Sequence, residues 1–245
     1  MAELHALDAV LDGAVVDDAV FVLRPDYRAL LVAVDGIRGG ESDQASHELL
    51  DTAEQAGRAA LRSSELADLA HVAAWRDAYR AFGAKPQRTR NSLEALLRRA
   101  DGGLPRVNRL TDVYNAVSVI HQIPLGGEDL ARYQGAPRLL LATGEEPFDT
   151  VVDGDIVVEH PDPGEVVWCD DAGVTCRRWN WRQARRTQLS ADTTTALFIL
   201  DALEPVSDTA LHAAADDLVT QIAAFSPEMV STRRLITPRH AAEGA

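Results

Sequence analysis

The residues best suited to chemistry lie on the helix that the sequence predicts from Arg109 to His121. Four short polar side chains at i, i+4, i+7 and i+10 share one of its faces: Asn108, Asp112, Asn115 and Ser118. Val113, Val117 and Ile120 form the opposite stripe, which we expect to face the core. Amide, carboxylate and hydroxyl groups suit hydrogen bonding to the sugar, amine or carbonyl of a ligand. Alternatively, the polar stripe only caps and buttresses neighbouring loops.

A second candidate segment is CRRWNWRQARRT, from Cys176 to Thr187, in which arginines bracket two tryptophans and an asparagine. Tryptophan rings offer stacking surfaces, and guanidinium groups bind phosphate. The segment therefore predicts ligand contacts by four residues: Arg178, Trp179, Asn180 and Arg182. In the alternative interpretation, Trp179 or Trp181 only anchors the loop.

The charges are unevenly distributed along an acidic chain of 245 residues with a net charge of −14. Residues 85–109 hold seven cations and two acids, residues 177–186 hold five cations and no acid, and residues 110–175 are strongly acidic. Because screening limits charge effects to about 10 Å, two basic islands can bind a phosphate backbone on an acidic protein. The expected RNA-binding residues are Lys85, Arg88, Arg90, Arg98, Arg99, Arg185 and Arg186. The competing interpretation is a pair of solvated loops.

Several classes of protein are disfavoured. The composition, 46% apolar and 25% charged, is that of a globular protein. The chain lacks both a membrane-length apolar run and a signal-peptide pattern, so we expect a cytoplasmic protein. Phosphate-binding, dinucleotide, zincin and nucleophile-elbow motifs are absent, and the histidines are scattered, so we expect neither a cofactor nor a metal. Cys169 and Cys176 are interpreted as reduced core thiols.

The elements that must position these residues follow from hydrophobic periodicity and turn residues. The expected strands cover residues 14–23, 29–34, 139–142, 155–159, 165–169, 174–177 and 194–201. The expected helices cover residues 42–62, 65–82, 92–100, 109–121 and 207–225. Helices grouped before strands indicate an α+β fold, a single compact domain with a mixed/antiparallel β core flanked by helices. We expect residues 1–82 to form N-terminal strands and helices, residues 83–230 the motif-bearing core, and residues 238–245 a loose tail.

Two long motifs resemble a known family. The run AWRDAYRAFGAKPQRTRNSLEALLRR, ending at Arg99, is followed by LPRVNRLTDVYNAVSVIHQIPLGGEDL. Together they resemble stand-alone relatives of the tRNA-editing module of the phenylalanyl-tRNA synthetase beta subunit, the B3/B4 domain. The likeness extends over roughly residues 15–225. It implies an α+β domain whose pocket receives the aminoacylated acceptor end of a tRNA and admits a water that hydrolyses the ester.

The resemblance also implies roles for individual residues. Asp112 and Asn115 match the helical motif of the editing module, and Asp112 is expected to bind the substrate's ammonium. From the polar stripe and the basic islands rather than from the resemblance, we expect Ser118, Thr187 and Thr193 to position water, and Asn108, Gly126 and Asp129 join the substrate-binding set. Gly126 stands where the synthetase module has a histidine. The editing module also has a carboxylate at a position that corresponds to a point near Gln183, and this carboxylate is missing here.

Two other functions compete with a tRNA deacylase. The first is a non-catalytic RNA-binding or interaction module that kept the fold and lost the chemistry. The second is a pocket for a free amino acid or a small metabolite. No DNA or membrane partner is expected, and because the synthetase's aminoacylation domain has no counterpart in this sequence, ATP-dependent ligation is not expected.

Overall fold

The computed structural model describes residues 2–238, which form an α+β fold with seven α-helices in that range. The helices are α1 (Ala2–Gly13), α2 (Asp18–Leu23), α3 (Gln44–Ser63), α4 (Ala70–Ala81), α5 (Ser92–Leu97), α6 (Arg109–His121) and α7 (Asp208–Phe225). Two 3₁₀ turns, η1 (Leu66–Asp68) and η2 (Leu130–Arg132), follow α3 and β3. No helix among these residues is long and apolar enough to cross a membrane.

The strands form three sheets. They are β1 (Val15–Val16), β2 (Arg28–Asp35), β3 (Leu125–Asp129), β4 (Arg138–Leu141), β5 (Phe148–Val152), β6 (Asp155–Glu159), β7 (Val166–Asp170), β8 (Gly173–Arg177), β9 (Arg182–Gln183), β10 (Thr195–Ala202) and β11 (Val230–Ile236). A central antiparallel sheet has the order β11-β2-β10-β3, and a second, mixed sheet has the order β1-β4-β7-β8-β9. The β5–β6 hairpin stands apart from both.

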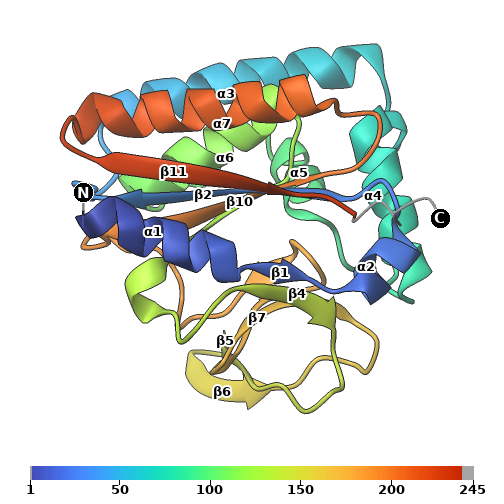
Figure 1. Ribbon diagram of the computed structural model, residues 1–245. Coiled ribbons are helices and arrows are strands. Elements are labelled where there is room, and N and C mark those ends of the chain that lie inside the picture. Colours follow the sequence, from blue (N-terminus) through green and yellow to red (C-terminus); the bar gives the residue numbers. More distant parts are fainter. Residues whose placement is uncertain (1, 239–245) are drawn as a thin grey trace, which may run out of the picture.

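The central sheet is covered on both faces, which explains why β2 and β10 are apolar almost throughout. Helices α3, α6 and α7 lie on one side of it, and α1 and the second sheet lie on the other (Figure 1). Leu30, Val32 and Val34 of β2 pack towards α6 and α7, whereas Ala29, Leu31 and Ala33 pack into the cluster beneath α1. Because successive side chains of a strand alternate between faces, one strand supplies both cores.

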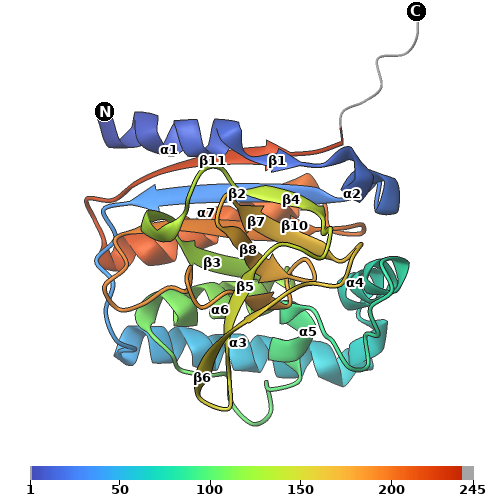
Figure 2. The ribbon, with the colours of Figure 1, turned by 90° about the horizontal axis from the view of Figure 1, so that it is seen from below.

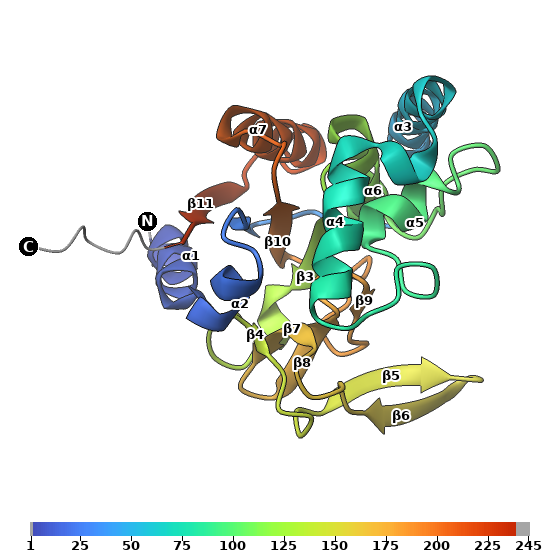
Figure 3. The same ribbon diagram turned by 90° about the vertical axis from the view of Figure 1, so that its right-hand side faces the viewer.

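The second sheet and the helices α4 and α5 form the two sides of the functional region. Figure 2 shows β4, β7 and β8 lying across the face of the central sheet. In Figure 3, α4, α5 and β9 lie beside one another, and the β5–β6 hairpin extends away on the side opposite α7. The residues between α4 and α7 therefore form most of the region where the two sheets meet.

Most expected elements are confirmed, several within one or two residues. α6 begins and ends at the expected residues, and α5 begins at the expected Ser92, where the side chain of the N-cap Asn91 accepts a hydrogen bond from the Glu94 amide. The β7–β8 hairpin pairs Cys169 with Val174, and both cysteines are free and buried. The aromatic side chains of α4 lie in the core.

Other expectations were wrong. The strand predicted over 14–23 is a two-residue strand followed by α2, because Asp18 begins a helix whose Val20 is fully buried. The predicted helix over 65–82 is divided into η1 and α4. The helices and strands α1, β3, β5, β9 and β11 were not predicted. The tail expected to be loose lies, beyond Pro238, outside the described residues.

The missed strand β3 has a clear physical cause. Its sequence, LGGED, carries two glycines, which are uncommon within strands, and no strand was predicted there. The preceding helix ends at His121, and its C-cap Gln122 adopts the left-handed conformation with φ of 54°. A Cβ atom at Gly127 would lie 2.8 Å from a ring carbon of Phe198, so glycine is needed for the close approach of β3 to β10.

Candidate functional site

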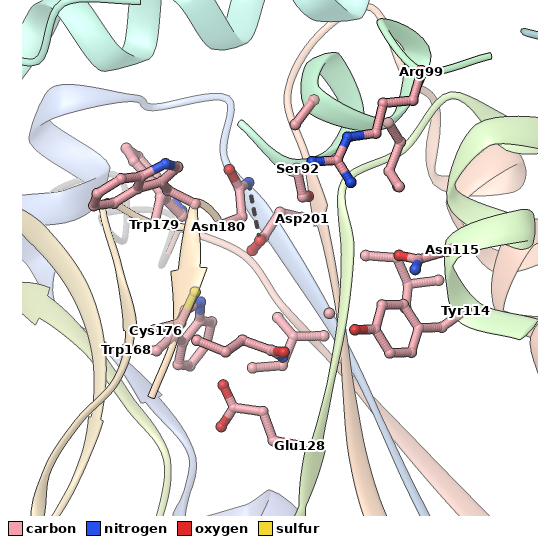
Figure 4. Close-up of a pocket in the computed structure, with 17 residues that line it drawn as sticks. Ser92, Arg99, Tyr114, Asn115, Glu128, Trp168, Cys176, Trp179, Asn180 and Asp201 are labelled. Atoms are coloured by element: carbon pink, nitrogen blue, oxygen red, sulfur yellow. Dashed lines mark hydrogen bonds between the residues drawn. The ribbon is translucent and has the colours of Figure 1, made fainter. Parts of the chain in front are cut away.

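A cavity of about 240 Å³ lies where the two sheets meet α5 and α6 (Figure 4). Its wall comes from several separate segments of the chain. From α5, the turn after it and α6 come Ser92, Ala95, Leu96, Arg99, Tyr114 and Asn115; from the strands and the turn after β8 come Leu125, Gly126, Glu128, Trp168, Cys176, Trp179, Asn180, Trp181, Gln183, Ile199 and Asp201. An apolar wall with a few convergent polar groups is the usual form of a small-molecule site.

One wall is the turn after β8, which is held in an unusual conformation. Arg178 and Trp179 both have positive φ, at 48° and 67°, which is uncommon for residues other than glycine. The fully buried Trp179 ring packs edge-on against Tyr27 at 4.9 Å and Trp75 at 5.3 Å between ring centroids. Trp179 therefore both anchors the turn, as the alternative interpretation held, and lines the cavity.

Glu165 stabilises this turn. Its carboxylate accepts hydrogen bonds from Arg177 Nε and Nη2, at 2.9 and 2.8 Å, and from the Arg178 amide and Nε, both at 3.2 Å. Glu165 is 3% exposed and Arg177 is 6% exposed, so this is a buried ion pair. The bonds from Glu165 raise the pKa of Arg177 further.

A buried carboxyl group, Asp201, lines the cavity between Asn180 and Glu128 (Figure 4). Its two oxygens accept hydrogen bonds from Tyr27 Oη at 2.6 Å and Asn180 Nδ2 at 3.2 Å, and Tyr79 Oη donates to Asn180 Oδ1 at 3.0 Å. Burial raises the pKa of Asp201 to about 7, although both hydrogen bonds act in the opposite direction. The group therefore changes charge near neutral pH.

A second buried carboxyl group, Glu128 of β3, also lines the cavity. It is 1% exposed, and Tyr133 Oη donates a hydrogen bond to Glu128 Oε2. Burial raises the pKa of Glu128 to about 7, while hydrogen bonds from Tyr133 and Thr175 oppose this shift. Two carboxyl groups with shifted pKa values in one cavity mark a candidate functional site.

The cavity has a cation on its α5 side. Figure 4 shows the guanidinium group of Arg99 beside Ser92 and above Asn115, at the other end of the cavity from Glu128. Arg99 is exposed, and within residues 2–238 no carboxylate lies within ion-pair distance of it. The cavity is therefore polar along its length, with the Arg99 guanidinium group at one end, the Glu128 carboxyl group at the other and the Asp201 carboxyl group between them.

Five of the predicted site residues line this cavity: Asn115, Gly126, Trp179, Asn180 and Arg99. Of these, Arg99 was predicted as an RNA-binding residue rather than a cavity residue. Sequence reasoning missed Glu128 and Asp201, as well as Tyr114 and Gln183. The sequence did point to Asp201, because it is the single acid in the apolar run TALFILDA, and burying a charged group costs free energy.

The polar stripe of α6 does not form one ligand-binding face. Residues 110–119 are all buried, because α6 lies between α3 and the central sheet, and only Asn115 of the stripe reaches the cavity. The fully buried Asp112 accepts hydrogen bonds from Ser46 Oγ at 2.9 Å and the Val107 amide at 2.8 Å. Ser118 donates to the Ile123 carbonyl. These contacts fit the alternative interpretation, in which the stripe supports neighbouring loops.

Asn108 is the N-cap of α6, and its substitution has a definite expected cost. Its side chain accepts a hydrogen bond from the Thr111 amide at 2.9 Å and donates to the Leu189 carbonyl at 3.2 Å. We expect Asn108→Ala to lower the free energy of unfolding by about 1–2 kcal/mol, as for other lost caps. Urea denaturation measures this. Asn108→Ser, which keeps an acceptor, should lose less, and equal losses would contradict the capping role.

The predicted water-positioning threonines lie behind β3 rather than along the cavity. Thr193 Oγ1 donates to Asp129 Oδ2 at 3.0 Å, and the Asp129 amide donates to the Thr187 carbonyl. Neither threonine nor Asp129 lines the cavity. Their contacts with one another connect β3 to the segment before β10.

The second basic island is neutralised within the protein. Arg177 and Arg178 pair with Glu165, Arg182 with Glu159, Arg185 with Asp149 and Arg186 with Asp170. Counting charges along the sequence could not reveal this, because the acids come from the acidic segment that precedes the island. The structure therefore gives Arg185 and Arg186 internal partners where RNA phosphates were expected.

The first basic island is divided. Arg90 and Arg98 share the buried Glu94 with Arg76. Lys85 and Arg88, which like Arg99 have no carboxylate partner among residues 2–238, line a second cavity of about 370 Å³ beside Arg178. Three predicted RNA-binding residues thus remain available to a ligand anion. Residues 2–238 contain no cluster of three or more metal-ligating side chains that could hold an ion.

Comparison with known proteins gives the family. The family model of the B3/4 domain matches residues 74–227, which is more than half of the chain. The chain therefore belongs to the B3/4 domain family, and the matched range includes every residue that lines the cavity.

The comparison with solved structures includes the N-terminal fragment of the phenylalanyl-tRNA synthetase beta-subunit from Pyrococcus horikoshii. That fragment is 12% identical, with a TM-score of 0.42, and the match covers 91% of this chain and 49% of the fragment. The chain thus spans about half of the fragment's length. No curated protein matches the sequence.

Proposed function

We propose that this protein binds aminoacylated tRNA ends and hydrolyses the ester that joins the amino acid to the terminal ribose. Membership of the B3/4 domain family and the resemblance of its motifs to a tRNA-editing module support a tRNA-related function. An ester of this kind is already activated, so catalysis requires chiefly an oriented water and stabilisation of the developing oxyanion.

The observation that carries the proposal is the polarity of the cavity. An aminoacyl ester has an ammonium group at one end and phosphodiester groups beyond the ribose at the other. Glu128 supplies a carboxyl group at one end of the cavity, Arg99 supplies an unpaired guanidinium at the other, and the Asp201 carboxyl group lies between them. The ammonium would lie towards Asp201, which replaces Asp112 in the role expected from sequence. Lys85 and Arg88 would contact phosphates further along the RNA.

Arg99 provides the first test. We expect Arg99→Ala to lower kcat/KM for a mischarged tRNA about 10- to 100-fold, which corresponds to the loss of a hydrogen bond to a charged group. The log–log salt dependence of RNA binding should fall in slope by about 0.7 to 0.9, the value for one phosphate contact. The measurement is release of amino acid from a panel of mischarged tRNAs.

Arg233→Ala is the matched control, because Arg233 lies on β11, at the edge of the central sheet opposite β3, and pairs with Asp216. Its substitution should leave both quantities unchanged. If no tRNA ester is hydrolysed faster than in buffer, the enzymatic proposal is wrong.

A free amino acid is the second candidate ligand, because its ammonium and carboxylate groups match the same carboxyl and guanidinium groups of the cavity. Calorimetry with free amino acids separates the candidates, since such binding should respond little to salt. Binding of free amino acids without turnover of any ester would favour the small-ligand function.

A further inference from the structure

Glu128 occupies a position from which it can act directly on a ligand. Residues i and i+2 of a strand share a face, so Glu128 and Gly126 of β3 both face the cavity, which both residues line. Gly126 has no side chain, and a Cβ atom there would lie 3.3 Å from Gln183 Nε2. Figure 4 shows the carboxyl group of Glu128 directed into the space below Asp201 and beside Trp168.

We propose that Glu128 is the general base of the hydrolysis, taking a proton from the water that attacks the ester. This inference rests on the proposed function and deepens it. Water gives one proton to the Glu128 carboxylate, and its oxygen forms a bond to the carbonyl carbon. The bond from that carbon to the ribose oxygen then breaks, and the ribose oxygen receives the proton from Glu128. The products are a free amino acid and a tRNA with a free terminal hydroxyl.

Tyr133 is the positioning residue for this base. Its hydroxyl group donates to Glu128 Oε2 and lies 3.4 Å from Thr175 Oγ1, so that one oxygen of the carboxyl group is fixed. The Tyr133 bond favours the ionised form of Glu128, while burial favours the protonated form. A base works best when its pKa is close to the operating pH, and the balance of these effects places Glu128 there.

Other groups on neighbouring elements also act on Glu128. Ionised Asp170 of β7 raises the pKa of Glu128, and Arg186 lowers it. The titratable side chains whose own charge interacts with Glu128 are Tyr114, Tyr133, Cys169, Cys176 and Asp201. The thiols and phenols have raised pKa values, so they stay neutral near pH 7, and Asp201 is the one competing carboxyl group among those five.

The test is single-turnover deacylation of a mischarged tRNA between pH 5.5 and 9, with wild type, Glu128→Gln and Tyr133→Phe. In wild type, the rate should rise with pH through about 7, as Glu128 loses its proton. Glu128→Gln should lower the rate about 10²- to 10⁴-fold and remove this rise. Tyr133→Phe should keep the rise and move its midpoint to higher pH, because the bond that favours the carboxylate is lost.

Glu145→Gln, a change at an exposed acid that lines none of the cavities described above, is the control and should match wild type. A Glu128→Gln protein with the wild-type rate and pH profile would overturn the assignment and leave the proposed function intact. A wild-type protein without turnover would reject both. If Glu128→Gln fails to fold, Tyr133→Phe decides, because an unmoved midpoint contradicts a base held by Tyr133.

Discussion

Glu165→Ala is expected to lower the free energy of unfolding by about 3–5 kcal/mol, the cost of removing one partner from a buried ion pair. The substitution would leave the Arg177 guanidinium, which is 6% exposed, without the two short hydrogen bonds that it donates to Glu165. Arg177 would keep only its bond to Glu159, at 3.0 Å. The desolvation cost of the guanidinium would then be largely uncompensated.

The same substitution should also disturb the cavity. Glu165 accepts the Arg178 amide, and Arg178 and Trp179 adopt positive φ values that cost about 1–3 kcal/mol each unless their surroundings impose them. Without Glu165, the turn that carries Trp179 and Asn180 loses one of its fixed points. We therefore expect reduced ligand binding even at temperatures where the variant is folded.

Urea unfolding of two variants provides the measurement and its control. Glu159→Ala removes a half-exposed partner of the same Arg177 and should cost no more than about 1 kcal/mol. Glu165→Gln keeps one acceptor oxygen and should fall between the two. If Glu165→Ala and Glu159→Ala are equally stable, the buried pair does not hold the turn.

Glu128→Gln is expected to become more stable relative to wild type as the pH rises from 5 to 8. The pKa of Glu128 is raised from 4.5 to about 7 in the folded protein, chiefly by burial. Between these values the folded form binds a proton that the unfolded chain has released. The contribution of Glu128 to the free energy of unfolding of wild type should therefore be greatest below pH 4.5. It should fall by about 1.4 kcal/mol per pH unit up to about pH 7.

A glutamine side chain does not titrate, so the stability of the variant does not fall for this reason as the pH rises. Denaturation at pH 5, 6, 7 and 8 measures the difference in unfolding free energy between the two proteins, which cancels the titration of all groups that Glu128 does not influence. We expect a change of about 2–3 kcal/mol over this range. Asp201 remains in both proteins. A difference that does not vary with pH would show that the Glu128 pKa is not raised by folding.

Local signals determined much of the secondary structure. The Asn91 cap and the polar residues around α6 act through neighbours within one turn of chain, so the sequence alone located the start of α5 and both ends of α6. The turn chemistry of the β7–β8 hairpin is equally local. Element β3 was missed because Gly127, one of its two glycines, is required by the approach of Phe198, a contact between residues about 70 positions apart.

The candidate site was predicted in part. The motif-bearing segments do converge, and Asn115, Trp179 and Asn180 share one cavity. The stripe that contains Asn115 was interpreted as one face, but its other members bind different neighbours: Ser46 of α3 binds Asp112, whereas Asn108 and Ser118 bind the Leu189 and Ile123 carbonyls. A helical period shows which side chains share a face and does not show which neighbour covers that face.

The sequence by itself determined the helices with strong caps and the α+β order of the elements, because these depend on interactions between residues close in the chain. Only the tertiary structure decided which charges remain free. Arg185 and Arg186 are neutralised by acids of distant strands, whereas Arg99 is not, and burial between β3 and its neighbours moves the pKa of Glu128 to about 7. Charge pairing and desolvation depend on distances in space, and these are fixed when the two sheets pack together.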